Sequence, residues 1–244
     1  MSLQEQFSDI VTYPRTADRV LGVLPIAAQF LWADAEEKFT ASNCNRGWAL
    51  RLPKRLLDLA IAVPALIVLL PLLLVLGLLI RLDSRGPALF RQTRRGLNGR
   101  AFDILKLRTM NVQENGETIV QARQGDARTT RLGRWLRVFS LDELPQLANV
   151  VKGDMSLVGP RPHAVAHDLF YASRIADYRR RQEVRPGLTG WAQVHGLRGP
   201  TPTLESMTRR VDLDVWYADH ASLALDLKIL LRTPLEVLRR RNAC

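Results

Sequence analysis

Two adjacent carboxylates, Asp142 and Glu143, are the residues of this chain best suited to covalent chemistry on phosphorus. They belong to the segment Ser140–Gln146 (SLDELPQ), where apolar residues begin to recur at helical spacing. Because a helix N-terminus favours negative charge, we expect it to keep Asp142 ionised and to lower the pKa of its carboxyl group. An ionised aspartate can attack phosphorus. Glu143 can hold Mg²⁺ together with substrate phosphates.

The same segment also has a purely structural interpretation. Ser140 followed three residues later by Glu143 is a capping box, in which each side chain binds a backbone amide of the other residue. Taken alone, this is the commoner role of such a pair. The catalytic interpretation therefore depends on other residues.

Basic residues elsewhere in the chain are candidate phosphate ligands. Arg161 lies between Pro160 and Pro162, which restrict the backbone and present a guanidinium suited to bidentate contact with phosphate. Lys106 and Arg108 come at the end of a predicted strand. Taken alone, Pro160-Arg161-Pro162 is also typical of a rigid turn. Lys106 and Arg108 alone are typical of an ordinary basic strand end.

The composition favours a phosphate-bearing partner. The 244 residues contain 35 Lys and Arg against 24 Asp and Glu, a net charge of +11, which suits nucleotides, anionic lipid headgroups or nucleic acid. Cys44 and Cys244 alone cannot build a disulfide framework or a four-cysteine zinc site, so a reducing, cytosol-facing location is expected. His163 and His167 lack a third metal ligand, and we expect them on the surface.

The run from Leu56 to Ile80 is apolar, with Asp58 as its single charge. A straight helix of this length reaches about 37 Å, enough to span a hydrocarbon core of roughly 30 Å. Both flanks are basic, however, and basic flanks stay on the cytoplasmic side. With Pro64 and Pro71 inside the run, we predict a re-entrant hairpin that enters and leaves on one face, with a spanning helix as the alternative.

The rest of the chain predicts a helix-rich α+β fold. Strands over 88–94 and 101–107 flank an Asn-Gly turn and form a basic hairpin. Helices are expected over 141–151, 163–183 and 204–215, and the tail 222–241 is either a membrane-surface helix or an ordinary packed helix. We divide the chain into an N-terminal extension (1–48), the membrane segment (49–85) and a cytosolic catalytic domain (86–244).

Taken together, the motifs resemble those of the bacterial sugar transferases, the monotopic polyprenyl-phosphate phosphoglycosyl transferases. The resemblance extends from Lys54 to about Thr233. The motifs follow the family's order: Gly86-Pro87, Phe90-x-Gln92-x-x-Arg95-Gly96, Lys106–Met110, Asp126-x-Arg128-x-Thr130, Ser140–Gln146, Asn149-Val150, Gly153–Ser156, Val158–Pro162 and Pro186–Trp191. Each motif is modest alone, and their conjunction in order is specific.

This resemblance implies a particular enzyme and site. By likeness, Asp142 attacks the β-phosphorus of a UDP-sugar and releases UMP, and undecaprenyl phosphate then takes the sugar-phosphate in a second step. Glu143 binds Mg²⁺, Arg137 and Arg161 lie at the phosphates, and Lys106 and Arg108 are further carry-overs. The implied location is the cytoplasmic face of the bacterial inner membrane. Membrane lipid, downstream glycosyltransferases or a second copy of the chain are the other implied partners.

The sequence departs from the family pattern at informative places. Leu70-Pro71 stands where the family commonly has Ser-Pro at its helix break. The segment Gln193–Thr201 resembles that of larger relatives that transfer glucose-1-phosphate for exopolysaccharides, but His195 replaces Asn and Pro200 replaces Glu. UDP-glucose is the expected donor, with UDP-galactose or another UDP-hexose as the alternative.

Two other classes of protein compete with this assignment. A basic membrane adaptor that binds anionic lipid or nucleic acid would explain the charge and the apolar run, but not the acidic pair among arginines. We therefore expect no nucleic-acid partner. A CDP-alcohol phosphotransferase would need several spanning helices and an aspartate-rich motif, neither of which the sequence contains.

Overall fold

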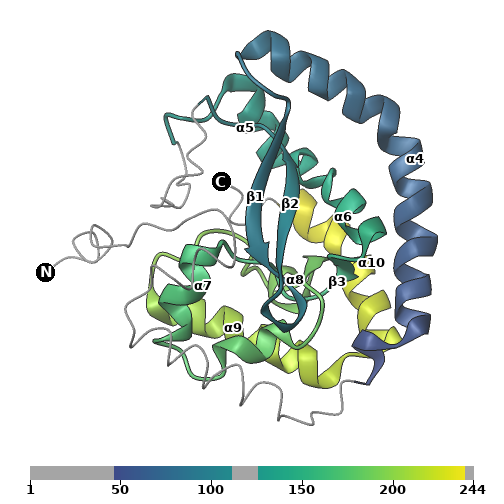
Figure 1. Ribbon diagram of the computed structural model, residues 1–244, viewed down its shortest axis with the longest axis vertical. Coiled ribbons are helices and arrows are strands. Elements are labelled where there is room, and N and C mark those ends of the chain that lie inside the picture. The colour runs from purple at the N-terminus through teal and green to yellow at the C-terminus, as the bar shows by residue number, and fades with distance from the viewer. Residues whose placement is uncertain (1–46, 112–125, 240–244) are drawn as a thin grey trace, which may run out of the picture.

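The computed structural model describes residues 47–111 and 126–239, which form a helix-rich domain with two small sheets (Figure 1). Most of the predicted extension 1–48 lies outside the described residues, and its boundary stays a prediction. The α-helices and strands are α4 (Leu52–Asp83), β1 (Leu89–Arg95), β2 (Ala101–Leu107), α5 (Arg131–Val138), α6 (Gln146–Lys152), β3 (Ser156–Val158), α7 (Val165–Ala172), β4 (Gly187–Thr189), α8 (Trp191–Val194), α9 (Leu204–His220) and α10 (Leu223–Arg239). The 3-10 turns are η1 (Trp48–Leu50), η2 (Leu97–Gly99), η3 (Leu141–Glu143) and η4 (Tyr178–Gln182).

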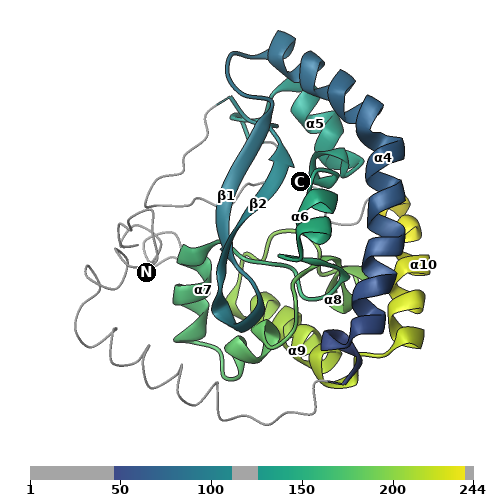
Figure 2. The same cartoon turned by 45° about the vertical axis from the view of Figure 1, so that its right-hand side comes forward.

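The apolar run forms one continuous helix, α4, rather than the predicted hairpin. Pro64 and Pro71 both lie inside the helix, and between Leu52 and Asp83 no returning segment is formed. Each proline removes one amide donor and pushes away the carbonyl four residues earlier, and α4 curves around the domain (Figures 1 and 2). Reversing the chain would free several more backbone groups, so the prolines here bend the helix without breaking it.

The two faces of α4 differ in their surroundings. One face is buried against the domain through Lys54, Asp58, Ala62, Leu76 and Ile80. The other exposes large apolar side chains from Leu52 to Leu82. Within the described ranges, α4 is the one helix long and apolar enough to cross a membrane. Such an extended apolar surface marks a contact with lipid or protein.

The start of α4 is held by a buried ionic cluster. Lys54 Nζ lies 3.2 Å from Asp58 Oδ1 and 2.9 Å from Asp226 Oδ2 on α10. Asp226 also accepts hydrogen bonds from Trp48 Nε1 at 2.6 Å and from the Tyr217 hydroxyl at 2.7 Å. Asp58, the single charge of the apolar run, is buried and accepts a hydrogen bond from the amide of Leu157 at 3.1 Å. The cluster joins α4 to β3, α9 and α10.

Replacing Lys54 by Met is expected to destabilise the protein by about 3–5 kcal/mol, because it leaves two buried carboxylates without their shared cation. Denaturant unfolding in detergent measures the change. Lys152→Met is the matched control, since the side chain of Lys152 is 68% exposed and lies 3.9 Å from Asp154. Equal stability of the two variants would contradict the anchoring role of Lys54.

The predicted β-hairpin is confirmed. Strands β1 and β2 pair antiparallel from Leu89 opposite Leu107 to Arg95 opposite Ala101. At the turn, Asn98 and Gly99 have φ values of 53° and 70°, a left-handed conformation that Asn and Gly tolerate best. The buried side chains of Ile104 and Leu107 fix β2 on the domain. Lys106 is thereby carried to the site described below.

A second sheet, β3 with β4, is parallel and was not predicted, because three-residue strands are too short to show periodicity. Two glycines allow its connecting loops to touch. A Cβ on Gly159 would lie 2.2 Å from the Arg185 carbonyl oxygen, and one on Gly187 would lie 2.1 Å from the Gly159 nitrogen. This close backbone contact leaves no room for a side chain at Gly159 or Gly187, and it fixes the chain two residues before Arg161.

The remaining helices agree in part with the sequence. The predicted helix 163–183 is wrong as a single element: α7 ends at Ala172, and Asp177 adopts a left-handed φ of 57° before η4. Helix α6 ends at Gly153 as predicted, with a φ of 97°. Helix α10 meets the start of α4 through the Lys54–Asp226 pair, and it buries Asp226 and Ile229. Its opposite face exposes a stripe of leucines, at positions Leu223, Leu227, Leu231, Leu235 and Leu238.

Candidate active site

The two carboxylates lie in η3, a short turn between α5 and α6. The predicted capping box is wrong. Ser140 has a left-handed φ of 59° and its hydroxyl makes no capping hydrogen bond, while the Glu143 amide donates to the Ser140 carbonyl at 3.2 Å. The Glu143 side chain is therefore available for contacts away from its own backbone.

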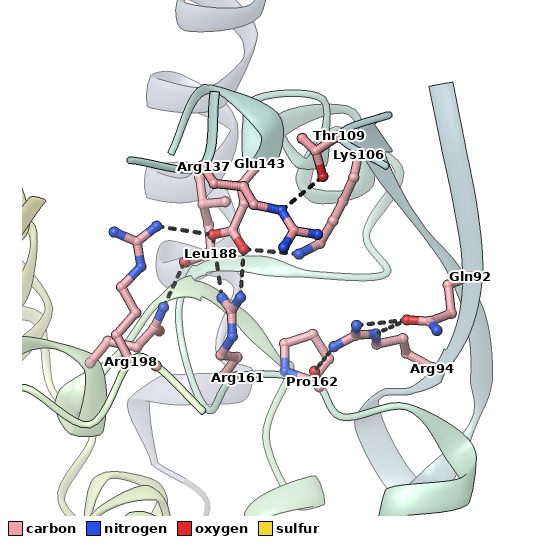
Figure 3. Close-up of polar contacts among 12 residues, drawn as sticks. Gln92, Arg94, Lys106, Thr109, Arg137, Glu143, Arg161, Pro162, Leu188 and Arg198 are labelled. Atoms are coloured by element: carbon pink, nitrogen blue, oxygen red, sulfur yellow. Dashed lines mark hydrogen bonds and ion pairs between the residues drawn. The ribbon is translucent and has the colours of Figure 1, made fainter. Parts of the chain in front are cut away.

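Glu143 is the centre of a basic cluster. Its Oε1 lies 3.0 Å from Lys106 Nζ and 2.5 Å from Arg161 Nη2, and its Oε2 lies 3.3 Å from Arg161 Nη1 and 3.4 Å from Arg198 Nη2. Figure 3 shows these three side chains approaching from different directions. Burial would raise the pKa of Glu143, but Arg161 and Lys106 hold it well below its usual value. Glu143 is thus ionised at neutral pH.

Asp142 has a different electrostatic environment from its neighbour. It is buried, and burial together with the charge of Glu143 raises the pKa of Asp142 to about 6, against the attraction of Lys106, Arg137 and Arg161. The predicted lowering of this pKa is therefore wrong. The turn η3 is too short to supply a full helix dipole, and desolvation exceeds its effect. Asp142 is still mostly ionised at pH 7.

Arg137 and Arg108 have different positions relative to this cluster. Arg137, at the end of α5, donates from Nε to Thr109 Oγ1 at 2.8 Å and lies beside Lys106 (Figure 3). Arg108 is buried away from Glu143, where it donates to the carbonyls of Ile80 at 3.2 Å, Ser84, and Arg85 at 2.6 Å. It satisfies carbonyls at the C-terminal end of α4, so the structure gives it a structural position in place of the predicted phosphate contact.

The turn that carries Arg161 is supported from behind by buried polar groups. Arg181 donates to the Arg161 carbonyl at 2.5 Å and to Asp214 Oδ2 at 2.7 Å. His163 is buried, contrary to expectation, with Nδ1 2.6 Å from the Tyr178 hydroxyl. Burial and Arg181 hold the pKa of His163 well below its usual value, so the ring is neutral. Arg181 thereby holds the backbone of Arg161, and Asp214 holds Arg181.

Sequence reasoning missed one member of the cluster, Arg198. Its segment was noted only for what it implies about the sugar. Nothing in its spacing from residue 143 indicated contact, because the two residues are 55 positions apart. The proximity arises from the loop between α8 and α9, which only the tertiary fold brings to η3.

The charges of the cluster limit how a metal could bind. Lys106, Arg137, Arg161 and Arg198 face only two carboxylates, and in the described part of the chain no group of three or more His, Cys, Asp or Glu is placed to hold a metal ion. A cation held by Asp142 or Glu143 therefore needs further anionic ligands. Mg²⁺ commonly binds through one or two carboxylates plus substrate phosphates. The residues present fit that mode, and they do not fit a closed metal site made by protein alone.

These features, an acidic pair faced by four basic side chains beside an exposed apolar helix, define a class of protein. The chain belongs to the bacterial sugar transferase family, whose model matches residues 49–240.

Three named relatives share 42–56% of their aligned residues with this chain. The chain is 56% identical over 195 residues to the UDP-glucose:undecaprenyl-phosphate glucose-1-phosphate transferase of Caulobacter vibrioides, covering 80% of this chain and 73% of that protein. It is 48% identical over 183 residues to the Escherichia coli protein of the same name, covering 75% of this chain and only 39% of the relative. It is also 42% identical to the exopolysaccharide production protein PSS of Rhizobium leguminosarum, over 77% of this chain and 96% of that protein.

The raised pKa of Asp142 predicts a pH dependence. If Asp142 acts as a nucleophile, the rate of UMP release should increase about tenfold per pH unit below pH 6 and level off above it. Single-turnover measurement without lipid acceptor isolates this step from titration of the lipid phosphate. A flat profile between pH 5 and 8 would show that ionisation of Asp142 does not control the step.

Proposed function

We propose that this protein transfers glucose-1-phosphate from UDP-glucose to undecaprenyl phosphate, with release of UMP, as the first step of exopolysaccharide or other surface glycan synthesis. The observation that carries the proposal is the pairing in η3: Glu143 is neutralised by three cations, and Asp142 is left as the adjacent carboxylate. The names of the relatives favour glucose over galactose as the sugar.

In the first half-reaction, a carboxylate oxygen of Asp142 forms a bond to the β-phosphorus of the donor. The bond from that phosphorus to the bridging oxygen breaks, and the oxygen leaves with UMP. In the second half-reaction, an oxygen of undecaprenyl phosphate attacks the same phosphorus and releases the carboxylate of Asp142, which yields the diphosphate-linked sugar lipid.

The basic side chains support this chemistry by placing positive charge at the diphosphate. Arg161 offers a planar pair of donors matched to phosphate oxygens, while the positive charges of Lys106 and Arg137 act on the carboxylate of Asp142. Mg²⁺ bound through Glu143 would neutralise charge that develops on the leaving phosphate. The arginines would orient the donor so that Asp142 approaches the β-phosphorus from the side opposite the leaving oxygen.

The way in which α4 is attached to the domain supports a proposal for the membrane arrangement. Its N-terminal end is tied to α10 by the Lys54–Asp226 pair at 2.9 Å, and its C-terminal end is held through Arg108 by the loop after β2. A helix with both ends attached to one domain cannot place those ends on opposite sides of a bilayer. We infer that the exposed faces of α4 and α10 lie in one leaflet, at the cytoplasmic face of the inner membrane.

The test uses membranes containing the full chain, with Mg²⁺ and undecaprenyl phosphate, and follows UMP release. UDP-glucose is expected to be turned over, and UDP-galactose at least tenfold more slowly. Preference for UDP-galactose would overturn the sugar assignment alone. Failure of every UDP-sugar, combined with salt-sensitive DNA binding, would favour the adaptor function instead.

A further inference from the structure

Arg198 is the most loosely held of the three cations on Glu143. Arg161 contacts both carboxylate oxygens, at 2.5 and 3.3 Å, and Lys106 contacts one at 3.0 Å. Arg198 makes a single contact, at 3.4 Å, from Nη2. A guanidinium carries five N–H donors, so most of the donors of Arg198 are not used by Glu143.

The loop that carries Arg198 is fixed although its side chain reaches solvent. The Leu197 amide donates to the Ala192 carbonyl at 3.0 Å, the Arg210 guanidinium donates to the Gly199 carbonyl, and Thr201 is buried. The Arg198 side chain is 23% exposed, whereas that of Glu143 is 8% exposed. The Arg198 side chain is thus partly exposed next to a buried carboxylate, slightly more so than Arg161 at 20% and Lys106 at 17%.

Glu143 cannot keep all its present partners and also bind a divalent cation. Its two oxygens already receive four N–H donors from three side chains, and a metal ligand must turn an oxygen lone pair toward the ion. The partner with one long contact costs least to release. A nucleotide sugar brings two negatively charged phosphates, for which a freed arginine is a matched ligand.

We propose that Arg198 is a donor-binding residue, which rests on Glu143 in the empty site and moves to the diphosphate of the nucleotide sugar when donor and Mg²⁺ bind. This inference rests on the proposed function, and it adds a residue that exchanges partners during binding. Arg161, with its backbone held by Arg181, keeps its position through the exchange.

The experiment measures binding of UDP-glucose with Mg²⁺ by titration calorimetry, in an Asp142→Asn background that leaves the donor intact. Adding Arg198→Gln is expected to weaken binding by about 10- to 100-fold, the loss of one charge-assisted contact. Arg198→Lys should recover part of the loss. Arg209→Gln is the matched control, since Arg209 lies exposed on α9, and its binding should equal that of the background.

A second measurement separates donor binding from a general role. With Asp142 intact, Arg198→Gln should raise KM for UDP-glucose by a similar factor and leave KM for undecaprenyl phosphate within about twofold. Binding equal to that of Arg209→Gln, or a rise confined to the lipid KM, would overturn the inference. If Asp142→Asn alone retains turnover, the covalent mechanism fails, whereas the role of Arg198 is still decided by the binding data.

Discussion

Replacing Asp142 by Asn should reduce UMP release by about a thousandfold or more, because the amide cannot form the bond to phosphorus. The protein should nevertheless fold, since burial already opposes the charge of this carboxyl group. Mass spectrometry of wild-type enzyme mixed with donor should detect a phosphosugar on the peptide that contains Asp142. Product formation without any such adduct, or full activity of the variant, would refute the covalent mechanism.

Asp142→Asn should lower activity but raise the stability of the fold. A stability measurement therefore serves as the control that the variant is folded. The folded wild type holds a proton on Asp142 up to about pH 6, whereas an unfolded Asp releases it near 3.8. The wild type therefore loses stability as pH rises from about 4 to 6, by up to about 3 kcal/mol. Asp142→Asn has no ionisable group at this position and lacks this loss. The free energy of unfolding of the variant, measured with denaturant, should therefore exceed that of the wild type by more at pH 8 than at pH 4.

Replacing Glu143 by Gln should give the second large effect. Loss of the carboxylate removes the proposed Mg²⁺ ligand, and we expect kcat to fall by about a hundredfold to a thousandfold. It also leaves Lys106, Arg161 and Arg198 without their shared counter-ion. Binding of UDP without Mg²⁺ should therefore become tighter, because the phosphates now meet uncompensated positive charge.

Calorimetric titration with UDP, with and without Mg²⁺, checks this expectation. In the wild type, Mg²⁺ should strengthen UDP binding, and in Glu143→Gln it should have a much smaller effect. Lys152→Met keeps Glu143 and its partners and is the control. An unchanged dependence on Mg²⁺ in Glu143→Gln would exclude Glu143 as the residue that holds the metal.

The sequence predicted local features of the fold better than distant contacts. The β-hairpin was predicted because Asn98-Gly99 determines a local turn, and the end of α6 because Gly153 is a local stop signal. The sheet formed by β3 and β4 was missed, since it pairs two segments about thirty residues apart through only three residues each. The bent α4 was predicted as a hairpin because both of its flanks are basic and because proline signals a change of direction but not its size.

In the candidate site, too, local motifs were predicted and contacts between distant segments were not. Asp142, Glu143 and Arg161 were found from their local motifs, and the fold brings Arg161 to Glu143. Arg198 was not found, since its contact depends on the path of a loop. The pKa of Asp142 was predicted in the wrong direction, because burial is a property of the folded domain that a seven-residue motif does not reveal.

Lys106 and Arg108 lie two residues apart, one at Glu143 and the other on the last carbonyls of α4. Two residues of extended chain measure about 7 Å. A short stretch of chain thus joins the apolar helix α4 to the candidate site, and under the membrane arrangement proposed above its length would fix the distance of the carboxylates from the lipid. In that arrangement, a soluble donor and a lipid acceptor would meet at a depth fixed by the protein itself.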